Sequence, residues 1–371
     1  MYSSFTGVSS NLHLESSQNS ESDGDFESWL RKRKLPFMCP PRSHWRRFFP
    51  LFLSTALLAC LCCNRPSNAQ SNPVELQAKV SVPFRFVAYG DTRFHDPKDT
   101  DDANPTARQA LVQAIADASP AFICFTGDIV FNGYDSDDWK TWDSETRIWR
   151  DKKIPVYPAL GNHDLRGNLT ADLANYFQHF PDLRNSRYYS VRAANTLLLA
   201  LDSSQDEVSG DQGKWLARQL DHLPPDADFV ILMLHHPPYT SAPGGIILAM
   251  THAARPSEKK LAEMLESRQA HTRARFVVFA GHVHNYERHE HGGVTYFVSG
   301  GGGAKPLLFE RPSTDLFQSN DINYHYLLVE VDRQQLKVTM NRLDLTKGRA
   351  EFTQPDSVNI SAPAPTTATS R

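Results

Sequence analysis

Cysteine is scarce in this sequence: the 371 residues contain five, and four of these lie within residues 1–69. The remaining one, Cys124, has no second cysteine within residues 70–371 with which to form a disulfide. This excludes a small fold held together by several disulfides. Because a single thiol is compatible with reducing and oxidising compartments, cysteine usage leaves the compartment open.

The body of the chain also lacks an excess of positive charge. Residues 70–371 carry 31 basic and 37 acidic side chains, a formal net charge of −6. Proteins that bind nucleic acids neutralise phosphates with clusters of lysine and arginine. We therefore expect no binding to nucleic acids.

The most apolar stretch, residues 48–63, is sixteen residues long, whereas a membrane-spanning helix needs about 20. Basic residues precede this stretch and small residues up to Ala69 follow it, which is the pattern of a secretory signal. We predict a disordered leader plus signal peptide over residues 1–69, with translation starting at Met38 and a secreted or periplasmic product. The alternatives are a lipid anchor at Cys60 and an uncleaved signal anchor.

Beyond residue 82, short apolar runs alternate with stretches of helical periodicity, which predicts one α/β domain over residues 70–354. Residues 355–371, rich in Pro, Thr, Ala and Ser, are expected to form a disordered tail. Helices are expected at residues 105–118, 136–150, 213–222 and 257–268. Strands are expected at residues 84–90, 121–126, 155–160, 188–192, 196–202, 229–234, 275–280, 294–299, 324–331 and 336–343.

Five of the expected strands end in residue types that bind metal ions. Taken alone, an Asp after a Gly is most commonly a turn residue or a helix cap. The repetition matters, because the carboxyl ends of parallel strands meet at one edge of a sheet. A mixed set of carboxylate, amide and imidazole groups suits Zn, Mn or Fe. The strand ends are Gly90-Asp91, Gly127-Asp128, Gly161-Asn162-His163-Asp164, His235-His236 and Gly281-His282-Val283-His284.

The order of these motifs resembles that of the calcineurin-like metallophosphoesterase superfamily, and residues 281–288 (GHVHNYER) are similar to the purple acid phosphatase branch. The resemblance implies a single-domain, four-layer α/β/β/α sandwich. It also implies a two-metal site that hydrolyses phosphate esters by means of a metal-bound hydroxide.

The resemblance further implies a role for each strand end. Asp128 would bridge two metal ions (Fe, Mn or Zn), and His235 is favoured over His236 as a ligand. His163 would orient the phosphate or protonate the leaving oxygen, with Asp164 supporting it. The other ligands would be Asn162, His235 and His282 on one ion, and Asp91 and His284 on the second.

Two positions depart from the family pattern. Arg93 stands where the family motif Asp-x-His has histidine, and Phe131 stands where purple acid phosphatases have a ligating tyrosine. Neither side chain can bind a metal ion, so we expect the Asp91/His284 site to be the weaker one. Water or His95 completes that site, or a single ion works with Arg93 as a second positive charge, or activity is lost.

Arg93 is also a candidate catalytic residue, because a guanidinium can bind a phosphate through two parallel hydrogen bonds. The alternative is a surface ion pair with one of the acidic residues at positions 96–102. The sequence thus favours an exported metal-dependent phosphohydrolase of phosphorylated small molecules, with monoesters preferred. The alternatives are a phosphodiesterase for cyclic nucleotides or other diesters, and a phosphate- or nucleotide-binding protein with impaired catalysis.

Overall fold

The computed structural model describes residues 73–244, 252–319, 323–346 and 348–364. The chain divides into the units Met1–Arg65 and Pro66–Arg371, and all the described residues belong to the second unit. The predicted leader, signal peptide, start at Met38 and lipid anchor at Cys60 lie outside the described residues. Within the ranges described, no helix has the length and apolar character needed to cross a membrane.

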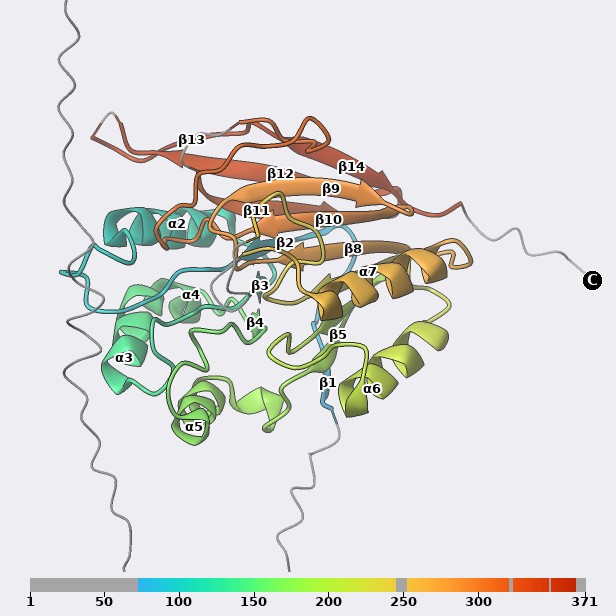
Figure 1. Ribbon diagram of the computed structural model, residues 1–371, viewed down its shortest axis with the longest axis horizontal. Coiled ribbons are helices and arrows are strands. Elements are labelled where there is room, and N and C mark those ends of the chain that lie inside the picture. Colours follow the sequence, from blue (N-terminus) through green and yellow to red (C-terminus); the bar gives the residue numbers. More distant parts are fainter. Residues whose placement is uncertain (1–72, 245–251, 320–322, 347, 365–371) are drawn as a thin grey trace, which may run out of the picture. The chain divides into compact units, whose positions relative to one another are not determined.

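Two seven-stranded sheets form the centre of the unit (Figure 1). The first sheet contains, in spatial order, β1 (Glu75–Gln77), β5 (Tyr189–Ala193), β6 (Thr196–Ala200), β7 (Phe229–Met233), β8 (Arg275–Ala280), β10 (Val294–Ser299) and β9 (Tyr286–His291). The second contains β13 (Glu351–Thr353), β12 (Gln335–Asp344), β11 (Tyr324–Val331), β2 (Phe84–Tyr89), β3 (Ile123–Phe125) and β4 (Val156–Pro158), and β14 (Ser357–Ser361) pairs with β12.

Strand β7 shows how the first sheet separates two hydrophobic cores. Its side chains alternate between the faces of the sheet, as the period of two in a strand requires. Ile231 and Met233 belong to a core shared with the second sheet, where Phe86 of β2 meets Phe279 of β8 edge to face at 6.2 Å between ring centroids. Val230 faces the other core. The two sheets therefore pack face to face.

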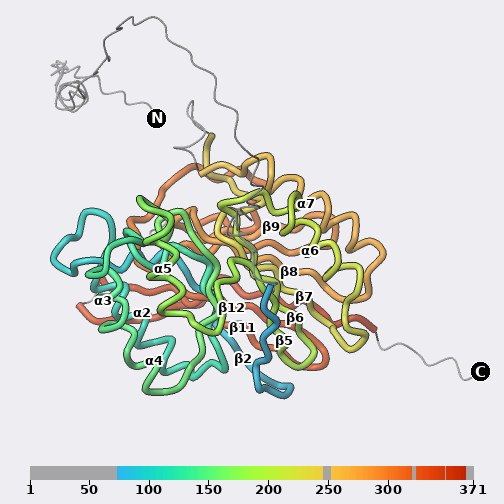
Figure 2. The backbone as a smooth tube through the Cα atoms, turned by 90° about the horizontal axis from the view of Figure 1, so that it is seen from below, coloured from blue at the N-terminus to red at the C-terminus, as the bar shows by residue number. Residues whose placement is uncertain are grey.

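Helices cover the outer faces of both sheets (Figures 1 and 2). Trp215 of α6 and Leu261 of α7 pack on the outer face of the first sheet, and α2 contacts β11 and β12 of the second. The predicted four-layer α/β/β/α sandwich is therefore confirmed. The helices are α2 (Pro105–Ala118), α3 (Ser136–Glu145), α4 (Arg147–Asp151), α5 (Leu169–His179), α6 (Gly210–Asp221) and α7 (Pro256–Gln269), with a short 3-10 helix at Pro181–Leu183.

One predicted helix is wrong in its extent. The stretch 136–150 is not continuous, because α3 ends and α4 begins at Thr146. The Thr146 hydroxyl donates to the carbonyl of Trp142 at 2.6 Å, and such local bonds compete with helix continuation. The Trp139, Trp142 and Trp149 side chains are all buried, and Trp142 and Trp149 pack edge to face against Phe125 and Tyr89 of the second sheet.

The predicted disordered tail is also corrected by the structure. Residues 357–361 form β14, which pairs antiparallel with β12, and Val358 and Ile360 pack against the core. The Asp356 carboxylate accepts hydrogen bonds from Tyr286 Oη (2.8 Å) and Arg288 Nε (2.9 Å). Composition missed this strand, because composition does not record its pairing with β12.

Truncation after Gln354 is therefore expected to lower the free energy of unfolding by about 3 kcal/mol or more, since a hydrogen bond to a charged group contributes about 1.5–3 kcal/mol. The protein would lose β14 and the acceptor for Tyr286 and Arg288. Denaturant unfolding measures the change, and truncation after Ala364 is the matched control. Equal midpoints for the two truncations would show that β14 contributes nothing to stability.

Candidate metal centre

The predicted site residues come together at the carboxyl ends of five parallel strands. In the second sheet, β2, β3 and β4 pair in parallel and lead into Asp91, Asp128 and Asn162. In the first sheet, β7 and β8 pair in parallel and lead into His235 and His282. All five side chains thus point toward one region at the end of both sheets, as the hydrogen bonds and contacts described below confirm.

The backbone at this centre adopts unusual conformations. The residues Asp91 (φ 58°), Arg93 (47°), Asp128 (52°) and His282 (71°) all lie in the left-handed region. A non-glycine residue in a sparsely populated region costs on the order of 1–3 kcal/mol. Hydrogen bonds between loops hold these four residues in the left-handed conformation. An example is the bond from Asp91 N to the Gly127 carbonyl at 3.0 Å.

Glycines in the motifs allow neighbouring loops to approach closely. A Cβ on Gly161 would lie 2.2 Å from Asp128 N, and one on Gly281 would lie 2.3 Å from Asp91 Oδ2. No side chain fits at these distances. Glycine is therefore required at positions 161 and 281, because another predicted ligand, Asp128 or Asp91, packs directly against its Cα.

Acceptor atoms converge on His235. Its Nδ1 donates to the Thr126 carbonyl at 2.9 Å, which leaves the lone pair on Nε2. That Nε2 lies 3.0 Å from Asn162 Oδ1, 3.3 Å from His282 Nδ1 and 3.4 Å from Asp128 Oδ1. Acceptor atoms placed this close, with too few protons to form hydrogen bonds between all of them, repel one another unless a cation binds between them. This set of four side chains therefore fits a bound metal ion.

A second, smaller group of donors lies at Asp91. The Nε2 atom of His284 is buried without a hydrogen-bond partner and lies 3.7 Å from Asp91 Oδ1. Its Nδ1 is held at 2.8 Å by the Lys305 carbonyl, and the Asp91 carboxylate accepts from His282 N at 3.0 Å. Two sets of three residues at this centre have their donor atoms within 4.8 Å of one another, namely Asp91/Asp128/His235 and His235/His236/His282.

Burial sets the protonation of these groups. It lowers the pKa of His235, His282 and His284, which keeps the imidazoles in the neutral form that binds metal ions. Burial, together with the nearby Asp128 charge, raises the pKa of Asp91 well above its usual value. Burial opposes ionisation of Asp128 as well, but His235, His163 and Arg93 outweigh it and hold the pKa of that carboxyl well below its usual range.

His163 is buried at the edge of this set. Its backbone N–H donates to Asp128 Oδ1 at 2.8 Å, and its Nδ1 bonds to the Phe131 carbonyl at 2.9 Å. The Nε2 atom is therefore the nitrogen available to a substrate. The Phe131 ring, with its centroid 5.2 Å from that of His163, packs beside it and offers no donor atom.

Asp164 acts on the backbone and not on the His163 ring. Its fully buried carboxylate accepts from the N–H groups of Ile129 (2.9 Å), Val130 (3.2 Å) and Gly161 (2.8 Å). These contacts tie the loop after β3 to the loop after β4. Asp164 thus positions both loops, which is a different kind of support from the one predicted.

Arg93 turns into the centre. Its Nη2 lies 3.5 Å from Asp128 Oδ2, and 13% of its side chain is exposed. The alternative of a surface ion pair with an acidic residue at positions 96–102 is therefore wrong. His95, the other candidate at this end, places its Nε2 3.9 Å from Asp99, while its Nδ1 bonds to the Arg93 carbonyl at 2.6 Å.

Several residues that surround the centre lie outside the predicted set of ligands. The His252 ring lies with its centroid 4.8 Å from that of His282. His236 Nδ1 bonds to Ser203 Oγ at 2.9 Å, and Arg255 donates to the Ser203 carbonyl. His236 belongs to a predicted strand-end motif, in which His235 is the favoured ligand. Ser203, His252 and Arg255 belong to no such motif, so only their spatial proximity identifies them.

The end of the GHVHNYER stretch is structural. Glu287 accepts from Thr240 Oγ1 at 2.8 Å, and Arg288 donates to Asp356 as described above. These side chains hold the loop after His236 and the turn before β14. The part of the motif beyond His284 therefore carries no direct information about the substrate.

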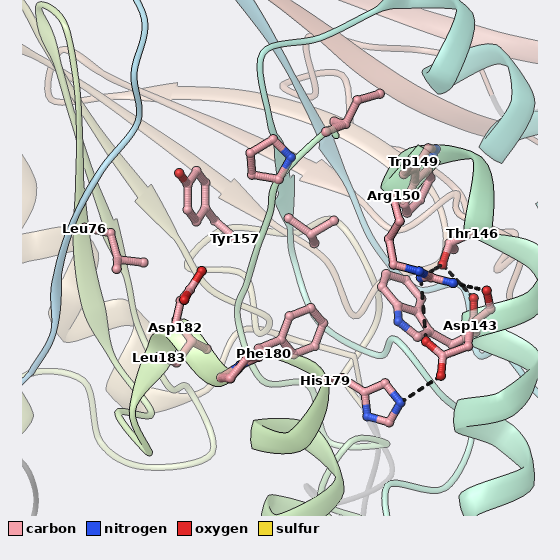
Figure 3. A pocket seen from close by; sticks show the side chains of 15 residues that line it. Leu76, Asp143, Thr146, Trp149, Arg150, Tyr157, His179, Phe180, Asp182 and Leu183 are labelled. Carbon is pink, nitrogen blue, oxygen red and sulfur yellow. Dashed lines mark hydrogen bonds and ion pairs between the residues drawn. The ribbon is translucent and has the colours of Figure 1, made fainter. Parts of the chain in front are cut away.

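A hollow of about 220 Å³ lies apart from the centre, between α3, α4 and β4 (Figure 3). Trp142, Trp149 and Phe180 form an apolar part, and Arg150 and Asp143 lie at its polar side. None of the predicted site residues lines it. Ligand pockets usually measure about 300–1,000 Å³, so this hollow is small for a substrate.

The family comparison agrees with the motifs. The profile of the calcineurin-like phosphoesterase family matches residues 84–286, more than half of the chain. This range contains all the predicted ligands and His163. A search among curated proteins found no matching relative.

Solved structures resemble the fold. A purple acid phosphatase from yellow lupin (Lupinus luteus) is 16% identical with a TM-score of 0.59, and the match covers 78% of this chain and 58% of that one. GAP50, described as the anchor in the inner membrane complex of Plasmodium, is 18% identical with a TM-score of 0.51, over 77% of this chain and 90% of that one. The chain thus spans a little over half the length of the lupin enzyme. At these identities the likeness concerns the fold alone.

Proposed function

Because the chain belongs to the calcineurin-like phosphoesterase family, we propose that it is a metal-dependent phosphohydrolase of phosphorylated small molecules. The observation that carries the proposal is the convergence of Asp128, Asn162 and His282 on His235 Nε2, at 3.0–3.4 Å. A metal ion bound there supplies Lewis-acid polarisation of the ester and positive charge for the transition state. Fe, Mn and Zn suit this mixed donor set.

The chain's own residues supply the remaining functions. His163 delivers a proton to the leaving oxygen through Nε2, because Nδ1 is held by the Phe131 carbonyl. Arg93 binds the phosphoryl oxygens, since its guanidinium is fixed beside Asp128. Asp164 keeps the two ligand loops together.

We propose phosphomonoesters as the preferred substrates. A terminal phosphoryl group carries more negative charge than a diester, and the centre offers both a metal ion and Arg93 to neutralise it. Hydrolysis of cyclic nucleotides or other diesters is the alternative. Export, proposed from the signal-like stretch at residues 48–69, would place this activity in the periplasm or outside the cell.

The test is an assay of p-nitrophenyl phosphate and bis(p-nitrophenyl) phosphate, before and after treatment with a chelator and with Mn²⁺ restored. We expect the monoester to be hydrolysed faster, with activity lost on chelation and recovered with Mn²⁺. Faster hydrolysis of the diester would favour the diesterase alternative. If the folded, Mn²⁺-loaded protein hydrolyses neither ester, the result favours the phosphate- or nucleotide-binding alternative.

A further inference from the structure

The two oxygens of the Asp128 carboxylate face different surroundings. Oδ1 lies among metal-binding atoms, 3.4 Å from His235 Nε2. Oδ2 instead faces the Arg93 guanidinium, with Nη2 at 3.5 Å. One side of the carboxylate is thus open to a metal ion, and a permanent positive charge already lies on the other side.

The position of Arg93 is built into the fold. Its backbone N–H donates to the Asp128 carbonyl at 3.0 Å, and its carbonyl accepts from Arg108 Nη1 at 3.2 Å. Arg108 is fully buried and binds Glu145 through Nε (2.9 Å) and Nη2 (2.6 Å). A buried ion pair therefore fixes the loop that carries Arg93. A long surface side chain with alternative rotamers would have no such support.

Arg93 also supplies charge where the buried carboxylates need it. Asp91 and Asp128 are both fully buried, and buried charges require compensation. The guanidinium provides one positive charge that cannot be lost at any ordinary pH. A metal ion at Asp128 Oδ2 would lie next to this charge and be repelled by it. On that side, Asp91 and His284 remain as the other protein donors, 3.7 Å apart.

We propose that Arg93 takes the place of a second metal ion. The centre then binds one ion tightly, through Asp128, Asn162, His235 and His282, and Arg93 presents its guanidinium to the phosphate as the second positive charge. This goes further than a weakened second site, and its phosphate-binding part rests on the proposed function. Asp91 then orients the loop that carries His282, because the His282 backbone N–H donates to both carboxylate oxygens of Asp91, at 3.1 Å (Oδ1) and 3.0 Å (Oδ2).

The test counts bound ions and needs no substrate. The wild-type protein, Arg93→His and the control Arg147→Ala are loaded with Mn²⁺, and metal content and electron paramagnetic resonance spectra are recorded. Arg147 lies on α4 with 78% of its side chain exposed. We expect one ion per chain and the spectrum of isolated Mn²⁺ in the wild type and the control. Arg93→His, with a neutral ligand in place of the guanidinium, should gain a second ion and an exchange-coupled spectrum.

Two outcomes would overturn the proposal. One is a wild-type protein that binds two Mn²⁺ ions with comparable affinity, and the other is an Arg93→His variant that still binds one. A wild type that binds two ions and hydrolyses phosphate esters refutes this inference and leaves the proposed function intact. A wild type that binds one ion and hydrolyses no ester refutes the proposed function and leaves the single-ion inference intact. Absence of bound Mn²⁺ would overturn both.

Phosphate affinity tests the second part of the proposal. Arg93→Ala is expected to weaken inhibition or binding by inorganic phosphate about 10- to 100-fold, since a charge-assisted hydrogen bond is lost. The number of bound Mn²⁺ ions and the melting temperature show whether the variant is folded and metal-loaded. Unchanged phosphate affinity in a variant that keeps its ion would show that Arg93 does not contact the phosphate.

Discussion

Replacement of Asp128 by Asn is expected to lower turnover of a phosphomonoester by about 10³-fold or more, because metal-based charge stabilisation contributes several kcal/mol and each 1.36 kcal/mol is tenfold. The substitution keeps the shape that accepts the His163 N–H at 2.8 Å. It removes the charge that faces both His235 Nε2 and Arg93. Metal content after dialysis, together with turnover at saturating Mn²⁺, measures the two effects.

The matched control is Asp172→Asn. Asp172 is another fully buried carboxylate, on α5 and outside the metal centre. It controls for the loss of a buried charge as such, and we expect normal metal content and turnover. If Asp128→Asn kept its metal ion through dialysis and turned over at the wild-type rate, Asp128 would not be a ligand.

Replacement of His163 by Ala is expected to lower turnover by about 10²- to 10⁴-fold, the usual range for loss of a positioned proton donor. Metal content should stay unchanged, because the contact of His163 with Asp128 is made by its backbone N–H. Burial, the largest influence, lowers the pKa of the His163 ring, so the protonated ring that can donate from Nε2 forms toward acidic pH. Turnover numbers and metal analysis on the same preparation are the measurements.

A comparison of leaving groups separates proton transfer from a general structural role. A poor leaving group, such as an alkyl alcohol, needs protonation more than p-nitrophenol does. The loss in His163→Ala should therefore be larger for an alkyl phosphate than for p-nitrophenyl phosphate. His222→Ala, at an exposed histidine that ends α6, is the control. An equal loss on both esters would argue against a proton donor.

The fold was predictable where hydrophobic periodicity was strong. Strands such as β7 and β8 are continuous apolar runs, which is typical of buried parallel strands. Prediction failed where a strand is too polar or too short for hydrophobic periodicity to reveal it and its pairing with another strand decides the structure. β9 (Tyr286–His291) is a polar sequence, and it is a strand because it pairs with β10. β14 (Ser357–Ser361) likewise is a strand because it pairs with β12, which ends at Asp344.

The convergence of the predicted ligands was predictable from local pattern, because each follows a strand and the strands are parallel within each sheet. The surroundings of those residues were not. His252 does not follow any of the strands expected from the sequence, yet its ring lies beside that of His282. Asp164 is adjacent to His163 in sequence, but its carboxylate binds the backbone of another loop. Side-chain direction and long-range contact are not encoded in spacing.

Residue types and their order alone were enough to identify the family, the α/β class and the residues able to bind a metal ion. This is because ligand chemistry is a property of each side chain, and strand-end position follows from short-range periodicity. The direction of Arg93 was a different matter. Sequence left a surface ion pair and a functional contact open. In the structure, Arg108 holds the backbone carbonyl of Arg93, and the Arg93 guanidinium lies 3.5 Å from Asp128. Only three-dimensional packing brings these residues, from separate parts of the chain, into one electrostatic unit.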